Sequence, residues 1–79
     1  MRIVYFVSAG TADPTRASIP LHLAANGSID VGHEATIVLG GDGTELVLGD
    51  TADTLEGVGL PPARELLAKL RDHAVPVYV

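Results

Sequence analysis

The sequence predicts an α/β protein with a mainly parallel sheet flanked by helices, in the order β-α-β-(loop)-α-β. Apolar, β-branched runs alternate along the chain with segments long enough to be helical crossovers, as parallel strands require. These runs also lack polar alternation, which is typical of strands in a parallel sheet. With 79 residues and no cysteine, residues 1–79 are expected to form one α/β domain held together by packing rather than by disulfides.

The first strand is predicted at residues 3–7 (IVYFV). Their unbroken apolar character favours a central strand that is covered on both faces. Small and polar residues follow, and Asp13-Pro14 is typical of a helix start, with aspartate as the N-cap and proline in the first turn.

The first helix is predicted from about residue 14 or 16 to about residue 29. Pro20 lies within it, and because proline lacks a backbone donor, it either kinks the helix or marks its true first turn. Apolar residues occupy most of the helix circumference, so we expect this helix to be buried on more than one side. In so small a protein, a second subunit is the expected covering surface.

The middle of the chain contains the second strand and an ambiguous segment. Residues 35–39 (ATIVL) predict a strand that ends at the glycine-rich residues 40–43. Residues 44–48 fit either a strand that pairs back as a hairpin or a short helix capped by Thr44. Residues 50–59 are polar and contain glycine, so they are predicted to form a loop.

The last helix is the clearest in the sequence. It opens at Pro61-Pro62, and its apolar residues form a single stripe: Ala63, Leu66, Leu67, Leu70 and Ala74. Glu65 and Lys69 have the i,i+4 spacing of an ion pair on the solvent side. Residues 76–79 (PVYV) then begin a third strand.

Charge and composition exclude several classes of protein. Five Lys and Arg residues stand against ten Asp and Glu, a net charge of −5, and the basic residues are scattered. This disfavours nucleic acid and anionic membranes as partners, and no apolar run is long enough to span a bilayer. The three histidines are dispersed and cysteine is absent, so we expect no metal site and no cofactor. The expected location is the cytoplasm.

Polar residues follow the predicted strands at their carboxyl ends, where open parallel sheets bind ligands. The candidate ligand-binding residues are Ser8, Thr11, Asp13, Asp42 and Thr44. The segment 40–44 (GGDGT) resembles the signature of the NAD-kinase and diacylglycerol-kinase superfamily, in which glycines let backbone amides approach nucleotide phosphates. The alternative is a tight turn in which glycine accepts a positive φ and Asp42 caps locally.

A second set of candidates lies on the first predicted helix. Ser18, His22 and Asn26 are spaced at i, i+4 and i+8, so they share one stripe. They are candidates for lining a pocket or contacting a neighbouring subunit. The alternative is a polar stripe whose hydrogen bonds are satisfied by water or backbone.

Four segments, taken in order, resemble the DsrE/DsrF-like family. They are residues 16–24 (RASIPLHLA), 32–39 (GHEATIVL), 55–62 (LEGVGLPP) and 66–79, with LL at its start and VPVYV at its end. The resemblance implies a small α/β sandwich around a mainly parallel sheet that assembles into homo-oligomers, often trimers or hexamers. It also favours residues 40–44 as the post-strand loop of this family rather than a kinase phosphate loop.

The resemblance also implies a functional context. Some members of the family are sulfur carriers in sulfur oxidation or tRNA thiolation, and they pass persulfide sulfur through a cysteine. In many members this cysteine directly follows the third strand. Residues 1–79 contain no cysteine, so they are expected to be an incomplete, N-terminal portion of a DsrE-like domain.

Three functional hypotheses follow. The leading one is a DsrE-like oligomeric protein of the sulfur-relay type, without the sulfur-accepting cysteine, that works with a sulfur-relay protein partner. The alternative is a non-catalytic oligomeric module for binding or assembly. A further alternative is nucleotide phosphate binding through residues 40–44. Whether the protein is an enzyme stays open.

Overall fold

A computed structural model describes all of residues 1–79. It contains one three-stranded parallel sheet in the order β1-β2-β3, formed by β1 (Arg2–Val7), β2 (Glu34–Leu39) and β3 (Val77–Tyr78). The connection from β1 to β2 runs through α1 (Pro14–Leu23) and the π-helical turn η1 (Ala24–Ser28). The connection from β2 to β3 runs through the 3-10 helix η2 (Gly41–Val47), α2 (Thr51–Thr54) and α3 (Ala63–Asp72). The predicted parallel α/β class is therefore confirmed.

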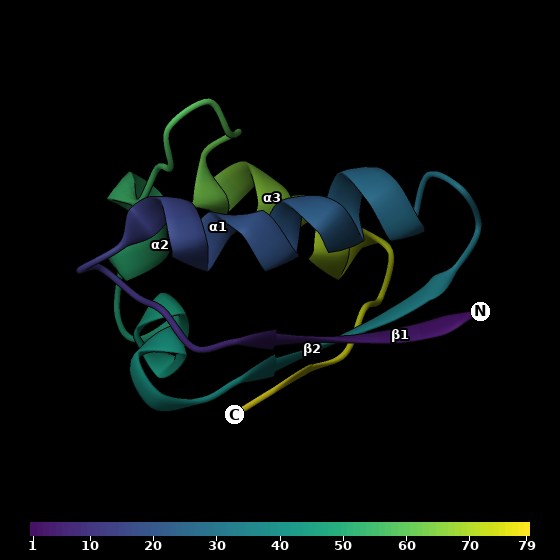
Figure 1. Cartoon of the computed structure of the whole chain (residues 1–79), viewed down its shortest axis with the longest axis horizontal. Coiled ribbons are helices and arrows are strands. Elements are labelled where there is room, and N and C mark those ends of the chain that lie inside the picture. Colours follow the sequence, from purple (N-terminus) through teal and green to yellow (C-terminus); the bar gives the residue numbers. More distant parts are fainter.

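The helices cover only one face of the sheet (Figure 1). Both crossovers move the chain in the same direction across the sheet, and right-handed crossovers of this kind place their helices on the same side. The prediction that residues 3–7 form a central strand buried on both faces is wrong. The strand β1 pairs only with β2 and lies at an edge of the sheet, and Val4 and Phe6 are 65% and 60% exposed.

The core lies between the sheet and the pair α1 and α3. Its largest fully buried side chains are Val7, Ser18, Leu21, Ile37, Leu39, Leu66 and Leu70. On α1, Leu21 is fully buried, whereas Ile19 and Leu23 remain about half exposed. Within one chain α1 is therefore covered on one side, and cover of its other side by a second subunit stays a prediction.

The predicted start of α1 is confirmed by its cap. The Oδ1 atom of Asp13 accepts a hydrogen bond from the backbone N–H of Arg16 at 3.1 Å, and Pro14 lies in the first turn. Pro20 lies inside the helix. The helix then widens into η1, where the N–H of Ile29 donates to the carbonyl of Ala24 at 3.1 Å.

Residues 41–47 form a 3-10 helix, so the hairpin alternative for residues 44–48 is wrong. Gly40, not Thr44, occupies the N-cap position, and the Thr44 hydroxyl donates to the carbonyl of Gly41 at 2.8 Å. The predicted loop at 50–59 is also wrong in part, because α2 forms one helical turn there. Local turn chemistry alone does not distinguish these short helices from irregular loops.

A complete Schellman motif ends α3. The N–H of Val75 donates to the carbonyl of Leu70, and the N–H of Ala74 donates to that of Arg71, each at 2.9 Å. Ala74 adopts a φ of 56°, in the left-handed region that this motif requires and that glycine accepts without steric cost.

We predict that Ala74→Gly raises the free energy of unfolding by about 1 kcal/mol, because the steric cost of a Cβ in the left-handed region is removed. Urea unfolding followed by circular dichroism measures the change. Ala68→Gly, the same replacement inside α3, is the matched control and is expected to lower stability by about 1 kcal/mol. A loss of stability in both variants would contradict the claim that the Cβ of Ala74 carries a steric cost in the left-handed region.

Candidate functional site

The loops at the carboxyl edge of the sheet are joined by Glu45 of η2. Its Oε1 atom accepts hydrogen bonds from the backbone N–H of Thr11 at 2.8 Å and from the Thr11 hydroxyl at 3.1 Å. Gly10 permits this approach, since a Cβ there would overlap the same Glu45 oxygen. Thr11 is therefore the one predicted candidate at this edge whose side chain is bound into a contact between two loops.

The other candidates at this edge have separate surroundings. Ser8 and Asp42 are exposed, with Asp42 in the first turn of η2. Asp13 caps α1 and also lies 3.5 Å from Nε of Arg16. Thr44 bonds within its own turn. The structure thus assigns local structural contacts to Asp13 and Thr44.

The position of Glu45 bears on the phosphate hypothesis for residues 40–44. Its carboxylate accepts both hydrogen bonds that Thr11 can donate to this edge. A phosphate placed there would lose these donors and would meet a negative charge at short range, where Coulomb repulsion is strong. Gly41 has the positive φ, 52°, that the tight-turn alternative requires, but η2 has no side-chain cap, so the expected local cap by Asp42 is wrong.

A polar cavity of about 420 Å³ lies beside Thr11. Its lining residues are Thr11, Pro14, Asp50, Thr51, Thr54, Leu55 and Glu56. Apart from Thr11, none of these was a candidate in the sequence, because they come from the segment predicted to be a loop and from the start of α1. No buried side-chain nitrogen or oxygen lacks a hydrogen-bond partner in the structure, so no such group marks this cavity as a ligand site.

The predicted stripe of Ser18, His22 and Asn26 does not form one surface. Ser18 is fully buried, and its hydroxyl donates to the carbonyl of Pro14 at 2.8 Å. His22 and Asn26 lie at the surface, where Nδ1 of His22 and Nδ2 of Asn26 are 3.1 Å apart. Ser18 therefore fits the alternative in which the hydrogen bonds of a polar side chain are satisfied by the backbone. His22 and Asn26 belong to a separate hydrogen-bond network.

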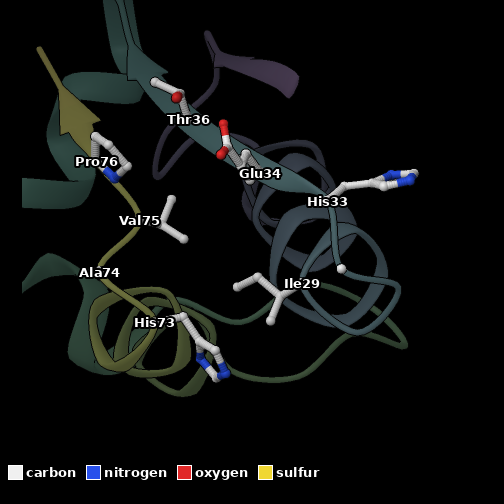
Figure 2. Close-up of a pocket in the computed structure, with 10 residues that line it drawn as sticks. Ile29, His33, Glu34, Thr36, His73, Ala74, Val75 and Pro76 are labelled. Carbon is white, nitrogen blue, oxygen red and sulfur yellow. The ribbon is translucent and has the colours of Figure 1, made fainter. Parts of the chain in front are cut away.

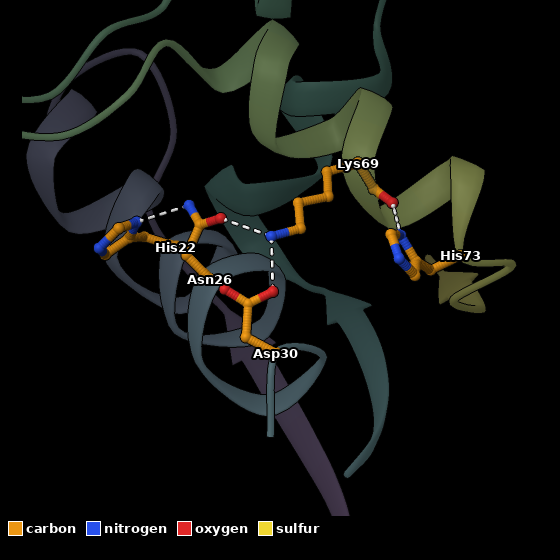
Figure 3. Close-up of polar contacts among 5 residues, drawn as sticks. All are labelled: His22, Asn26, Asp30, Lys69 and His73. Atoms are coloured by element: carbon orange, nitrogen blue, oxygen red, sulfur yellow. Dashed lines mark hydrogen bonds and ion pairs between the residues drawn. The ribbon is translucent and has the colours of Figure 1, made fainter. Parts of the chain in front are cut away.

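That network joins α3 to η1 through Lys69 (Figure 3). The Nζ atom of Lys69 donates to Oδ1 of Asn26 at 2.9 Å and to Oδ1 of Asp30 at 2.8 Å. Because an ammonium group only donates, the Asn26 oxygen faces Lys69 and its amide nitrogen donates to His22. The predicted ion pair between Glu65 and Lys69 is wrong, since Lys69 reaches across to η1 instead.

The uncovered face of the sheet is a feature that the sequence did not predict. We define the open face as Arg2, Val4 and Phe6 of β1, Glu34, Thr36 and Val38 of β2, and Tyr78 of β3. Phe6, Val38 and Tyr78 lie in register across the three strands, and Tyr78 is 59% exposed. At one end, Nε of Arg2 lies 2.9 Å from Oε2 of Glu34.

No group of three or more histidine, aspartate or glutamate side chains is placed to hold a metal ion. None of the helices has the length and apolar character needed to cross a bilayer.

The class of protein that this geometry defines is a small parallel α/β protein with helices on one face of the sheet. No protein-family model, curated protein or solved structure matches the chain.

Proposed function

We propose that this chain is a non-catalytic α/β assembly module that pairs with a second copy of itself through the open face. The observation that carries the proposal is the exposure of Val4, Phe6 and Tyr78 on one side of a parallel sheet. Parallel sheets are normally covered on both faces. Burial of these side chains removes apolar area from water and provides the driving force for association.

Charge favours a second copy as the occupant. A symmetric dimer places the same patch on both sides of the contact, so any net charge on that patch is doubled. The chain carries a net charge of −5, which opposes self-association through most of its surface. The open face is an exception, because its only charged residues, Arg2 and Glu34, form an ion pair with each other.

Area sets the expected strength of this dimer. The exposed parts of Val4, Phe6 and Tyr78 amount to roughly 350 Å² per copy, comparable to the largest apolar patch on a typical monomer. With the surrounding rim, the contact reaches about 1,000 Å² in total, the lower end for a specific interface. We therefore expect a dissociation constant on the order of micromolar rather than nanomolar.

The family resemblance supplies the context that we propose for this assembly. It supports a sulfur-handling, DsrE-like complex, a hexamer that contains such dimers, that holds a sulfur-relay protein partner. Persulfide chemistry needs a thiolate, and residues 1–79 contain no cysteine. The proposed role of these residues is therefore to build the assembly, not to carry sulfur.

The dimer proposal predicts that Val4→Lys raises the dissociation constant at least about 10-fold, because each copy would place an ammonium group in an apolar contact. Sedimentation velocity over a range of concentrations measures it. Val58→Lys is the matched control, since Val58 is 86% exposed in a loop and the change in charge is the same. A monomeric wild-type chain at millimolar concentration, or an equal response to both replacements, would contradict the proposal.

A further inference from the structure

One rung of the sheet between β2 and β3 lacks its hydrogen bonds. The N–H of Ile37 donates to the carbonyl of Pro76 at 2.9 Å. Along a strand, every second residue directs its N–H and C=O to the same neighbour. Ala35 therefore also points toward the β3 side, yet neither its N–H nor its C=O has a hydrogen-bond partner in the structure.

Two residues that precede β3, Ala74 and Pro76, account for the missing hydrogen bonds at Ala35. In the register of this ladder, residue 76 would donate to the carbonyl of Ala35, but Pro76 has no N–H. Ala74 would accept from Ala35, but it is turned into the left-handed conformation that ends α3. Ala35 is only 7% exposed, and unpaired buried backbone groups are rare and costly.

A cavity of about 450 Å³ adjoins this rung (Figure 2). Ala35 is among the residues that line it, and Ile29 and Val75 provide apolar walls. Figure 2 shows Ile29 and Val75 on two sides of the space and His33 pointing away from it.

Nδ1 of His73, another lining residue of this cavity, lies 2.9 Å from the carbonyl of Lys69. Since that carbonyl only accepts, Nδ1 donates, and Nε2 stays free to bond elsewhere. The volume lies within the range of ligand sites.

We propose that this cavity binds a short extended peptide segment that completes the rung at Ala35. One residue of the peptide donates its N–H to the Ala35 carbonyl and accepts a hydrogen bond from the Ala35 N–H. A residue in an extended chain carries both groups on one edge, so it matches the vacant pair. A small apolar side chain on that segment packs between Ile29 and Val75. The cavity borders the open face at Glu34 and Thr36, but the hydrogen bonds proposed at Ala35 do not depend on self-association.

The vacant rung itself is tested by amide hydrogen exchange, measured by NMR on the full chain without ligand. We expect the N–H of Ala35 to exchange at least about 100-fold faster than that of Ile37, because only Ile37 is hydrogen-bonded. Equal protection of the two amides would show that the rung is closed and would overturn the proposal.

Peptide binding is tested by titrating the 15N-labelled chain with acetyl-Val-Ala-Val-amide. We expect the Ala35 amide signal to shift and its exchange to slow. The matched probe is the same peptide N-methylated at its alanine, which cannot donate to Ala35, and we expect it to bind at least about 10-fold more weakly. Equal binding of both peptides, or no shift at Ala35 at millimolar peptide, would overturn the proposal.

Two protein variants complete the experiment. Pro76→Ala restores an N–H opposite the Ala35 carbonyl, and Pro76 is exposed, so the change is expected to preserve the fold. It should weaken peptide binding at least about 5-fold by closing half of the rung. Val4→Lys should leave peptide binding unchanged, which separates this site from the proposed dimer. Unchanged binding by Pro76→Ala would overturn the assignment to this rung.

Discussion

Gly43→Ala is expected to lower the free energy of unfolding by about 3 kcal/mol, the upper end for overpacking a tight contact. Gly43 is buried where η2 crosses the carboxyl end of β1. A Cβ at this position would overlap the carbonyl oxygen of Val7 and lie 2.7 Å from its carbonyl carbon. The backbone of Val7 is itself held, because its carbonyl accepts the N–H of Gly40 at 3.0 Å. Relief therefore requires η2 to move.

Chemical denaturation with urea, followed by circular dichroism, measures the loss. Gly27→Ala is the matched control: a Cβ there would have nothing within 4 Å, and Gly27 lies in the helical turn η1. That variant is expected to gain roughly 0.5–1 kcal/mol, because alanine favours helix more than glycine does. If Gly43→Ala stays within about 1 kcal/mol of the parent chain, η2 is free to move away from β1.

Leu21→Ala is expected to lower the free energy of unfolding by about 3 kcal/mol, within the range of about 2–5 kcal/mol for leucine truncation in a core. Leu21 lies on the inner side of α1 and is fully buried. Its replacement removes apolar contacts with the sheet and leaves a cavity. In a small domain such a loss is a large fraction of the total stability.

The control for this prediction is Leu23→Ala, the same change two residues along α1, where the side chain is 49% exposed. It is expected to cost less than about 1 kcal/mol. Urea unfolding at a concentration where the chain is monomeric compares the two. Equal losses would contradict the difference in burial between Leu21 and Leu23 within one chain.

Several features were predictable because they depend on near neighbours in the chain. The Asp13 cap requires only the hydrogen-bond geometry of Asp13 and Arg16, three residues apart. The apolar stripe of α3 depends on helical periodicity, and three of its residues, Ala63, Leu66 and Leu70, are buried as expected. The strand runs depend on the β-branched character of their residues, and both longer strands form where expected.

The candidate site was less predictable because its contacts join distant residues. Thr11 was a candidate, but its partner Glu45 lies 34 residues away. Lys69 had a suitable neighbour at i−4, yet it bonds to Asp30, 39 residues away, because η1 packs against α3. The unpaired rung at Ala35 depends on Pro76 lying where an N–H would face the Ala35 carbonyl, a position that only the pairing of β2 with β3 establishes.

Local chemistry alone established the class of fold, the start of α1, the amphipathic character of α3 and the absence of a thiol in residues 1–79. The tertiary structure decided which side of each element is covered. The apolar run of β1 is compatible with burial on one face or on two, and the outcome depends on where both crossovers place their helices. Here they lie on the same side, so the sheet that was expected to be buried on both faces has an open face available to a second copy.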